Sequence, residues 1–136
     1  MTVVVAYLPS PEGEAAFEAG VAEAVRRDEP LIAVNSPRSG APITSTLADD
    51  DTLARLREQA GAANVSFEVR QDGHTDDLVE TLLSIADEVD ATVLVLGLRR
   101  RTAVGKLLMG SNSQRILLQS ERPVLAVKAR AADDAS

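Results

Sequence analysis

The chain has 136 residues and an acidic balance, with 14 Lys and Arg against 21 Asp and Glu and a formal net charge of −7. This length fits a single domain, and the negative charge excludes a general electrostatic attraction to nucleic acid or to anionic membranes. The chain has no cysteine and one histidine, His74, so the sequence excludes disulfides and thiol nucleophiles and argues against a zinc site or a Ser-His-Asp triad.

The first predicted element is a strand at Val3 to Tyr7, a continuous apolar run of the kind that is buried on both faces of a sheet. No basic segment precedes it, so it does not have the pattern of a signal peptide. No apolar run approaches the roughly 20 residues that span a bilayer. We therefore expect a cytoplasmic protein without a membrane segment. A helix over about residues 11–27 and a second buried strand at Leu31 to Val34 follow.

The middle of the chain begins with a long polar stretch at residues 35–50, which contains two Pro and one Gly and is predicted to be a loop. Loops of this length are often functional. A second helix is predicted over about 51–62. In the strand that follows, the apolar residues Val65, Phe67 and Val69 alternate with polar ones, which predicts an edge strand with one face in water.

The last third of the chain continues the alternation of helices and strands. We predict a third helix over about 78–89, a buried strand at Thr92 to Leu96 that ends at Gly97, and a basic loop. A last helix at about 111–120 and a final strand at Val124 to Val127 complete one domain over residues 1–128, with a disordered tail at 129–136. This order predicts an α/β fold with an open, parallel, five-stranded sheet and helices on both faces. Ligands of such sheets bind at the carboxyl ends of the strands, where the strand order reverses, so we look for a site near Tyr7 and Leu8 and near Gly97.

The segment from Gly97 to Arg115 carries the most chemical information. The start of the last helix offers the unpaired N–H groups of Ser111, Asn112 and Ser113, and together with the helix dipole these favour a phosphate. Glycines at both ends of the loop, Gly97 and Gly110, allow the backbone to approach a ligand. Five cations lie in this otherwise acidic chain within the same segment: Arg99, Arg100, Arg101, Lys106 and Arg115. The alternative is that Ser111 only caps its helix and that the arginines form a solvated loop.

Two better-known phosphate motifs are excluded. Gly105-Lys106 is similar to the end of a P-loop, but that motif needs Gly where this chain has Arg100 and Ser or Thr where it has Leu107. The dinucleotide fingerprint G-x-G-x-x-G does not occur in the sequence.

The same segment resembles the signature of the universal stress protein family, G-x2-G-x9-G-[ST]. Gly97 matches the first glycine, Gly110 the third and Ser111 the hydroxyl residue. Ser113, the Ser10-Pro11-Glu12 turn and the late Arg-Pro-Val-Leu-Ala-Val run at 122–127 also fit, and the resemblance extends from Thr2 to about Lys128. The resemblance implies a Rossmann-like fold with adenine-nucleotide-hydrolase-like topology. It also implies a stress-response module that binds ATP, with or without Mg²⁺.

The resemblance also implies where the ligand would lie. Adenine and ribose contacts fall on Ala6, Tyr7, Leu8 and Ser36, and phosphate contacts fall on Gly97, Gly110, Ser111, Asn112 and Ser113. Two positions depart from the family pattern. The second glycine of the signature is Arg100, which could obstruct a phosphate or pair with one. The Asp that ATP-binding members usually carry after the first strand is Leu8, and losing such an anchor costs about 1–3 kcal/mol where its partner stays buried and unpaired.

The alternatives to a nucleotide-binding module are a dimeric interaction protein, an enzyme and a nucleic-acid-binding protein. A dimeric interaction protein of the same fold, without a nucleotide, is the alternative that the departures at Leu8 and Arg100 favour, with the homodimer formed through Val124 to Val127. An enzyme is not expected, because the loop from Gly97 to Gly110 has no Asp or Glu to hold Mg²⁺. We predict no catalytic residue, no metal ligand of the protein and no nucleic-acid partner.

Overall fold

The computed structural model describes residues 1–35, 48–71, 78–100, 107–108 and 111–129. The elements in chain order are β1 (Thr2–Ala6), α1 (Pro11–Arg27), β2 (Leu31–Val34), α3 (Asp50–Ala62), β3 (Phe67–Arg70), α4 (Leu78–Glu88), β4 (Ala91–Arg100), β5 (Leu107–Leu108), α5 (Ser111–Gln119) and β6 (Val124–Lys128). The type of each predicted element is confirmed, and α3 starts one residue before the predicted Asp51.

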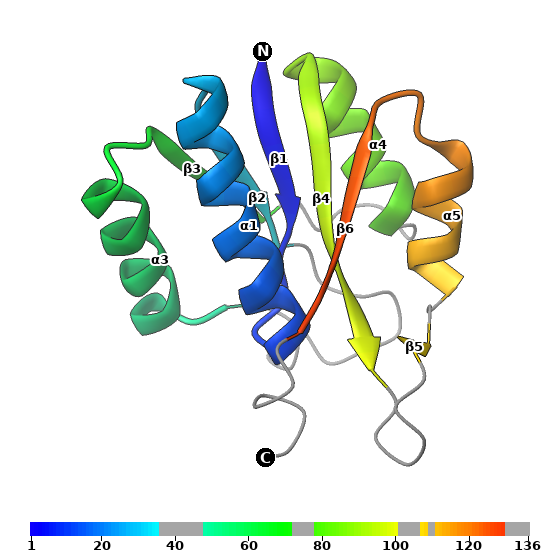
Figure 1. The fold of residues 1–136 in the computed structure, drawn as a ribbon, viewed down its shortest axis with the longest axis horizontal. Coiled ribbons are helices and arrows are strands. Elements are labelled where there is room, and N and C mark those ends of the chain that lie inside the picture. The colour runs from blue at the N-terminus through cyan, green and yellow to red at the C-terminus, as the bar shows by residue number, and fades with distance from the viewer. Residues whose placement is uncertain (36–47, 72–77, 101–106, 109–110, 130–136) are drawn as a thin grey trace.

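The predicted parallel sheet is confirmed, with the order β3-β2-β1-β4-β6. The chain adds β2 and β3 on one side of β1, and β4 and β6 on the other. The strand order therefore reverses between β1 and β4, and these two strands end at the same edge of the sheet (Figure 1).

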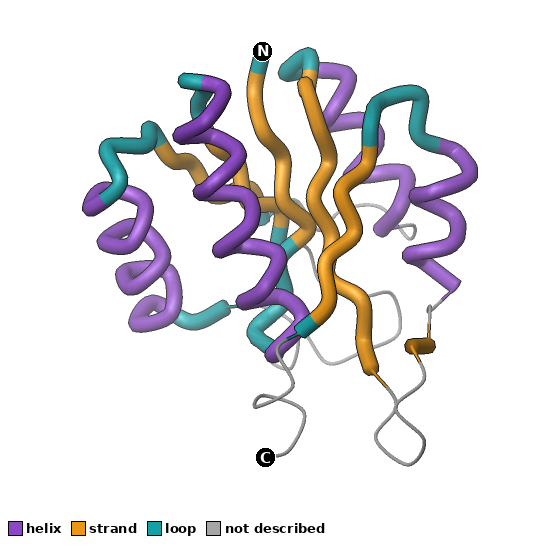
Figure 2. Tube along the Cα trace, viewed as in Figure 1, coloured by secondary structure: helices purple, strands orange, loops and turns teal. Residues whose placement is uncertain are grey.

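Helices cover both faces of the sheet, as the apolar strands require (Figure 2). One core cluster joins alternate residues of the strands to α1 and α3, and includes Phe17 and Leu56. The cluster on the opposite face joins the other residues of the same strands to α4 and α5, and includes Leu82 and Ile116. Val3, Val4 and Val5 are fully buried (0% exposed), so β1 contributes side chains to both clusters.

Local capping determines where the helices near the carboxyl edge begin. Ser10 precedes α1 in an extended conformation, and its Oγ accepts a hydrogen bond from the Gly13 N–H at 3.1 Å, with Pro11 in the first turn. Asp49 caps α3 in the same way through the Thr52 N–H at 2.8 Å. The C-cap of α1 is Asp28, which adopts a left-handed conformation with φ of 55°.

The predicted end of the fourth strand at Gly97 is wrong. β4 continues to Arg100, and its last two residues, Arg99 and Arg100, pair antiparallel with Leu108 and Leu107 of β5. Gly97 itself pairs in register with Val127 of β6, so it lies within the strand. Strand length is decided by the pairing partners, and β5 was not predicted. Arg100 is therefore the last residue of a strand rather than part of a loop.

The two ends of the sheet agree with the sequence pattern. β3 is an edge strand that pairs with β2, and its alternating side chains are half-buried or exposed, as predicted. At the other end, Ala129 follows β6 and is buried (4% exposed). Residues 130–136 lie outside the described ranges, so the disordered tail stays a prediction.

None of the described helices is long and apolar enough to cross a membrane.

Candidate functional site

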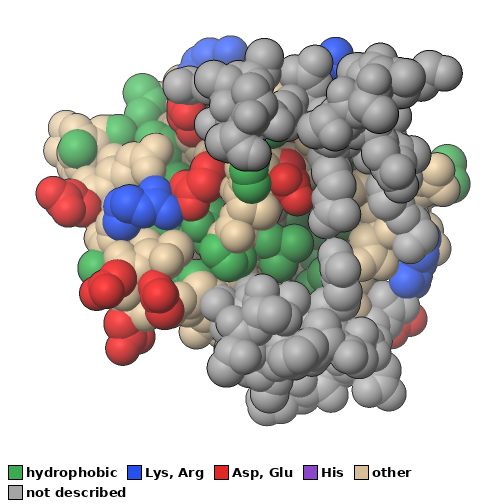
Figure 3. Space-filling model, turned by 90° about the horizontal axis from the view of Figure 1, so that it is seen from below, with side chains coloured by type: hydrophobic (Ala, Val, Ile, Leu, Met, Phe, Trp, Pro, Cys, Tyr) green, Lys and Arg blue, Asp and Glu red, His purple; other side chains and the backbone are tan. Residues whose placement is uncertain are grey.

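The candidate site is the carboxyl edge of the sheet, at the ends of β1 and β4. Ala6 ends β1 and is half-buried, Tyr7 is buried and Leu8 is half-buried. The Tyr7 N–H donates to the Val34 carbonyl at 2.9 Å, which keeps the chain beside β2 for one residue after β1. Figure 3 views this edge from below, with hydrophobic side chains in the middle and Asp and Glu side chains beside them.

Asn35 connects three segments of this edge. Its Nδ2 donates to the Tyr7 carbonyl at 3.1 Å, and its Oδ1 accepts from the Ala48 N–H at 2.7 Å and from Gln71 Nε2 at 3.0 Å. The side chain is fully buried, with an exposed fraction of 0%. Buried amides are stable only when their polar atoms are bonded, so this network holds the ends of β1, β2 and β3 together.

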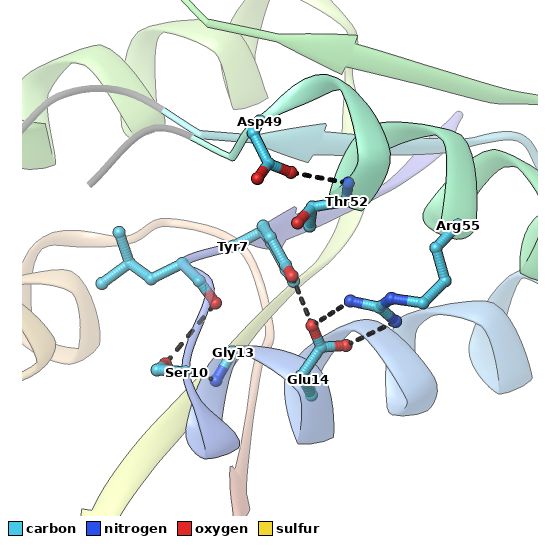
Figure 4. A network of polar contacts seen from close by, with 8 residues as sticks. Tyr7, Ser10, Gly13, Glu14, Asp49, Thr52 and Arg55 are labelled. Carbon is cyan, nitrogen blue, oxygen red and sulfur yellow. Dashed lines mark hydrogen bonds and ion pairs between the residues drawn. The ribbon is translucent and has the colours of Figure 1, made fainter. Parts of the chain in front are cut away.

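A second network joins α1 and α3 across the end of β1 (Figure 4). The Tyr7 hydroxyl donates to Glu14 Oε1, and Arg55 donates to both carboxylate oxygens of Glu14, at 2.6 and 3.1 Å. Burial of the Tyr7 ring, followed by its hydrogen bond to the Glu14 carboxylate, raises the pKa of Tyr7 well above its usual range. Tyr7 is therefore a neutral donor, and Glu14 has its charge satisfied within the protein.

The start of α5 lies at the same edge. β5 is paired to the end of β4, and Ser111 begins α5 three residues after Leu108. Consecutive Cα atoms are about 3.8 Å apart, so this short link keeps the first turn of α5 close to the end of β4. Asn112 and Ser113 in that turn are half-buried. The first N–H groups of a helix have no intrahelical acceptor and favour an anion.

Close packing within the chain requires a glycine at position 97. A Cβ atom built on it would lie 2.0 Å from the carbonyl oxygen of Glu12 and 2.6 Å from its carbonyl carbon. The first turn of α1 therefore packs directly on the backbone of β4. The predicted contact of Gly97 with a ligand stays a prediction.

The structure brings most of the predicted site residues to one edge. Ala6, Tyr7 and Leu8 follow β1, while Gly97 and Arg100 lie in the last part of β4 and α5 starts nearby. Ser36 and Gly110 lie outside the described residues. The side chains of Arg100 and Ser111 are likewise not described, and only their backbone is placed.

Sequence reasoning missed Asn35, Gln71, Glu14 and Arg55. Asn35 had a weak signal, since it is the polar residue that directly follows a buried apolar run. Glu14 and Arg55 had none, because they are 41 residues apart and belong to different helices. Among the described residues, no group of three or more His, Cys, Asp or Glu side chains could hold a metal ion.

Comparisons with known proteins find relatives that match most of this chain. The sequence profile of the Universal stress protein family matches residues 1–128. A universal stress protein of Mycolicibacterium smegmatis is 41% identical over 126 residues, which cover 93% of this chain and 96% of that protein. The stress response protein NhaX of Bacillus subtilis is 30% identical over 125 residues, which cover 88% of this chain and 69% of that protein.

Solved structures show the same fold. The universal stress protein of Archaeoglobus fulgidus superposes with a TM-score of 0.74 at 25% identity, over 92% of this chain and 96% of that one. A universal stress protein solved in complex with cAMP has a TM-score of 0.69 at 27% identity, over 96% of this chain and 98% of that one.

Proposed function

Because this chain belongs to the universal stress protein family, we propose that it is a cytoplasmic stress-response module that binds an adenine nucleotide, ATP in the first place. One observation carries the proposal. The point where the strand order reverses, between β1 and β4, lies at the same edge as the start of α5. Open α/β sheets bind ligands at this reversal, and helix starts bind phosphates.

The charges of the edge indicate how the nucleotide lies. Glu12 is in the first turn of α1, and Asp50 and Asp51 are in the first turn of α3. These carboxylates repel phosphate from the β1 side. The first turn of α5 has no acidic residue, and the sequence before it contains Arg99 to Arg101 and Lys106. The phosphates therefore face α5, and the base and ribose face Ala6, Tyr7 and Leu8.

The relative solved with cAMP supports a nucleotide ligand for this chain, at 27% identity. Leu8 offers no carboxylate to a base, so recognition on the β1 side falls to backbone groups. We propose that the residues of this edge bind adenine nucleotides by their phosphate and sugar more than by base-specific side chains.

Mg²⁺ held by the protein does not fit the α5 side of this edge, where the phosphates are proposed to lie. Residues 97–113 contain no Asp or Glu, and hard cations such as Mg²⁺ are held in proteins mainly by carboxylates. Any Mg²⁺ would arrive on the phosphates of ATP. We propose a binding role without fast turnover, because phosphoryl transfer needs charge-stabilising groups and a positioned nucleophile.

The proposal is tested on protein purified without added nucleotide. Mass spectrometry of the small molecules released on denaturation should detect an adenine nucleotide, and calorimetric titration should measure binding of ATP, AMP and cAMP to the emptied protein. If nothing is released and millimolar ATP gives no binding, the proposal is wrong.

Asn112→Asp should weaken phosphate binding selectively. A carboxylate in the first turn of α5 repels a phosphate held there, and two charges about 5 Å apart near a protein surface interact by about 3 kcal/mol before screening by salt. We expect the Kd for ATP to rise about tenfold or more, while the Kd for adenosine changes less than about twofold. The helix itself should not suffer, because acidic residues favour helix starts.

The control for this variant is Gln119→Glu, which changes the net charge equally at the exposed far end of α5. Its Kd for ATP should match that of the wild type. Equal weakening by both variants would show that net charge, and not the start of α5, controls binding.

The second candidate function is a dimeric interaction module. β6 pairs with β4 and with no other described strand, and its side chains from Val124 to Val127 are half-buried. An apolar edge strand normally needs cover, and a second copy of the same strand would supply it. Light scattering at micromolar concentration should give twice the mass of one chain, and a monomer would rule this candidate out.

A further inference from the structure

The Tyr7–Leu8 peptide follows the end of β1, one of the two strands between which the sheet order reverses. The N–H groups of Val3 and Tyr7 donate to the carbonyl oxygens of Pro30 and Val34. The backbone polar groups of the odd-numbered residues in this run therefore point toward β2. The Tyr7 carbonyl faces the same side and accepts a hydrogen bond from Asn35 Nδ2 at 3.1 Å. In a trans peptide the C=O and the following N–H point in opposite directions, so the Leu8 N–H points toward the β4 side.

Among the described residues, none accepts a hydrogen bond from the Leu8 N–H, so no bond within that part of the chain competes with a ligand for it. Leu8 itself is half-buried, and its carbonyl oxygen is in contact with Ser10 Oγ at 3.5 Å. A donor that is fixed in direction at the reversal point can bond an oxygen or nitrogen of the ligand at little entropic cost.

We propose that Asn35 is a positioning residue for the nucleotide: it fixes the Tyr7–Leu8 peptide so that the Leu8 N–H is presented to the base or the ribose. This inference rests on the proposed function and deepens it. Asn35 does not need to touch the ligand, because its bond to Tyr7 acts through one rigid peptide.

The other bonds of Asn35 anchor it for this role. Its Oδ1 accepts from the Ala48 N–H at 2.7 Å, and Ala48 immediately precedes the cap of α3. Gln71 Nε2 donates to the same oxygen at 3.0 Å but makes no bond to Tyr7. Gln71 is therefore a matched control, since its loss removes the bonds to Asn35 Oδ1 and to the Ala48 carbonyl and leaves the bond from Asn35 to the Tyr7 carbonyl in place.

The test compares Asn35→Asp and Asn35→Ser with Gln71→Ala, by calorimetric titration of adenosine, ATP and inorganic pyrophosphate. Asn35→Asp places a carboxylate oxygen against the Tyr7 carbonyl in place of a donor. We expect this variant to bind adenosine and ATP about tenfold more weakly and pyrophosphate within about twofold of the wild type. Asn35→Ser should show the same selectivity, and Gln71→Ala should bind all three ligands within about twofold of the wild type.

Amide hydrogen exchange on the wild-type protein tests the geometry without a variant and without relying on the ligand. In the free protein the amides of Tyr7 and Ala48 should be protected and that of Leu8 should exchange fast, and adenosine should protect Leu8. An equal loss for pyrophosphate, or unchanged adenosine binding in the Asn35 variants, would overturn the inference alone. A wild-type protein that binds none of the three ligands would overturn the proposed function, and a protected Leu8 amide in the free protein would overturn the inference whatever the binding result.

Discussion

Gly97→Ala is expected to destabilise the protein by about 3 kcal/mol or more, out of the 5–15 kcal/mol that a domain of this size usually has. The new methyl carbon would lie 2.0 Å from the carbonyl oxygen of Glu12, which belongs to the backbone of the first turn of α1. A flexible side chain could rotate away from the new methyl group at little cost. The atoms met here are helix backbone, so the first turn of α1 would have to move off β4 as a unit. The measurement is chemical denaturation without ligand, compared with the wild type.

Two other glycines calibrate this result. A Cβ at Gly13 would lie 1.7 Å from the Leu8 carbonyl oxygen, so Gly13→Ala should destabilise at least as strongly. A Cβ at Gly61, in the last turns of α3, has nothing within 4 Å, and Ala there should stabilise the helix by about 0.5–1 kcal/mol. If Gly97→Ala unfolds at the same denaturant concentration as the wild type, the close packing of α1 on β4 is wrong.

Phe17→Ala is expected to cost about 4 kcal/mol, within the range of about 3–5 kcal/mol for deletion of a buried Phe. Phe17 is fully buried in α1 (0% exposed), and its ring meets Tyr7 and Phe67 edge to face, with centroids 6.1 and 5.4 Å apart. It therefore joins α1 to the end of β1 and to β3, and it contacts the ring of Tyr7, whose hydroxyl donates to Glu14. Thermal and denaturant unfolding would measure the loss.

The matched control is Val25→Ala in the same helix, where the side chain is 54% exposed and the cost should stay within about 0.5 kcal/mol. A loss below about 1 kcal/mol for Phe17→Ala would mean that the three rings do not form one packed unit. In a chain with 2% aromatic residues, these three rings are the only Phe and Tyr side chains, and all three meet on one face of the sheet.

The first glycine of the family signature has a packing role in this chain that the sequence did not reveal. The signature alone suggested that Gly97 leaves room for a ligand, whereas the structure places the Glu12 backbone against it. A loss of nucleotide binding in a Gly97 variant would therefore be ambiguous. Asn112 is the better probe of the phosphate side, because a substitution there leaves the packing of α1 on β4 intact.

The sequence by itself determined the order and type of all the described elements except β5. A buried strand shows a continuous apolar run, an edge strand alternates apolar and polar residues, and a helix shows an apolar stripe at helical spacing. These signals come from residues within a turn or a strand of one another, so they can be read without knowing the partners. Alternation of the elements then implied the parallel sheet and the reversal beside Tyr7 and Leu8.

Only the tertiary structure decided what lies against what at that edge. The end of β4 at Arg100 depends on pairing with β5, and the need for glycine at position 97 depends on where α1 crosses the strand. The bond from Asn35 to Tyr7 spans 28 residues, and that from Arg55 to Glu14 spans 41. Such contacts leave no periodic pattern in the sequence, because each exists only after the sheet order has brought two distant segments together.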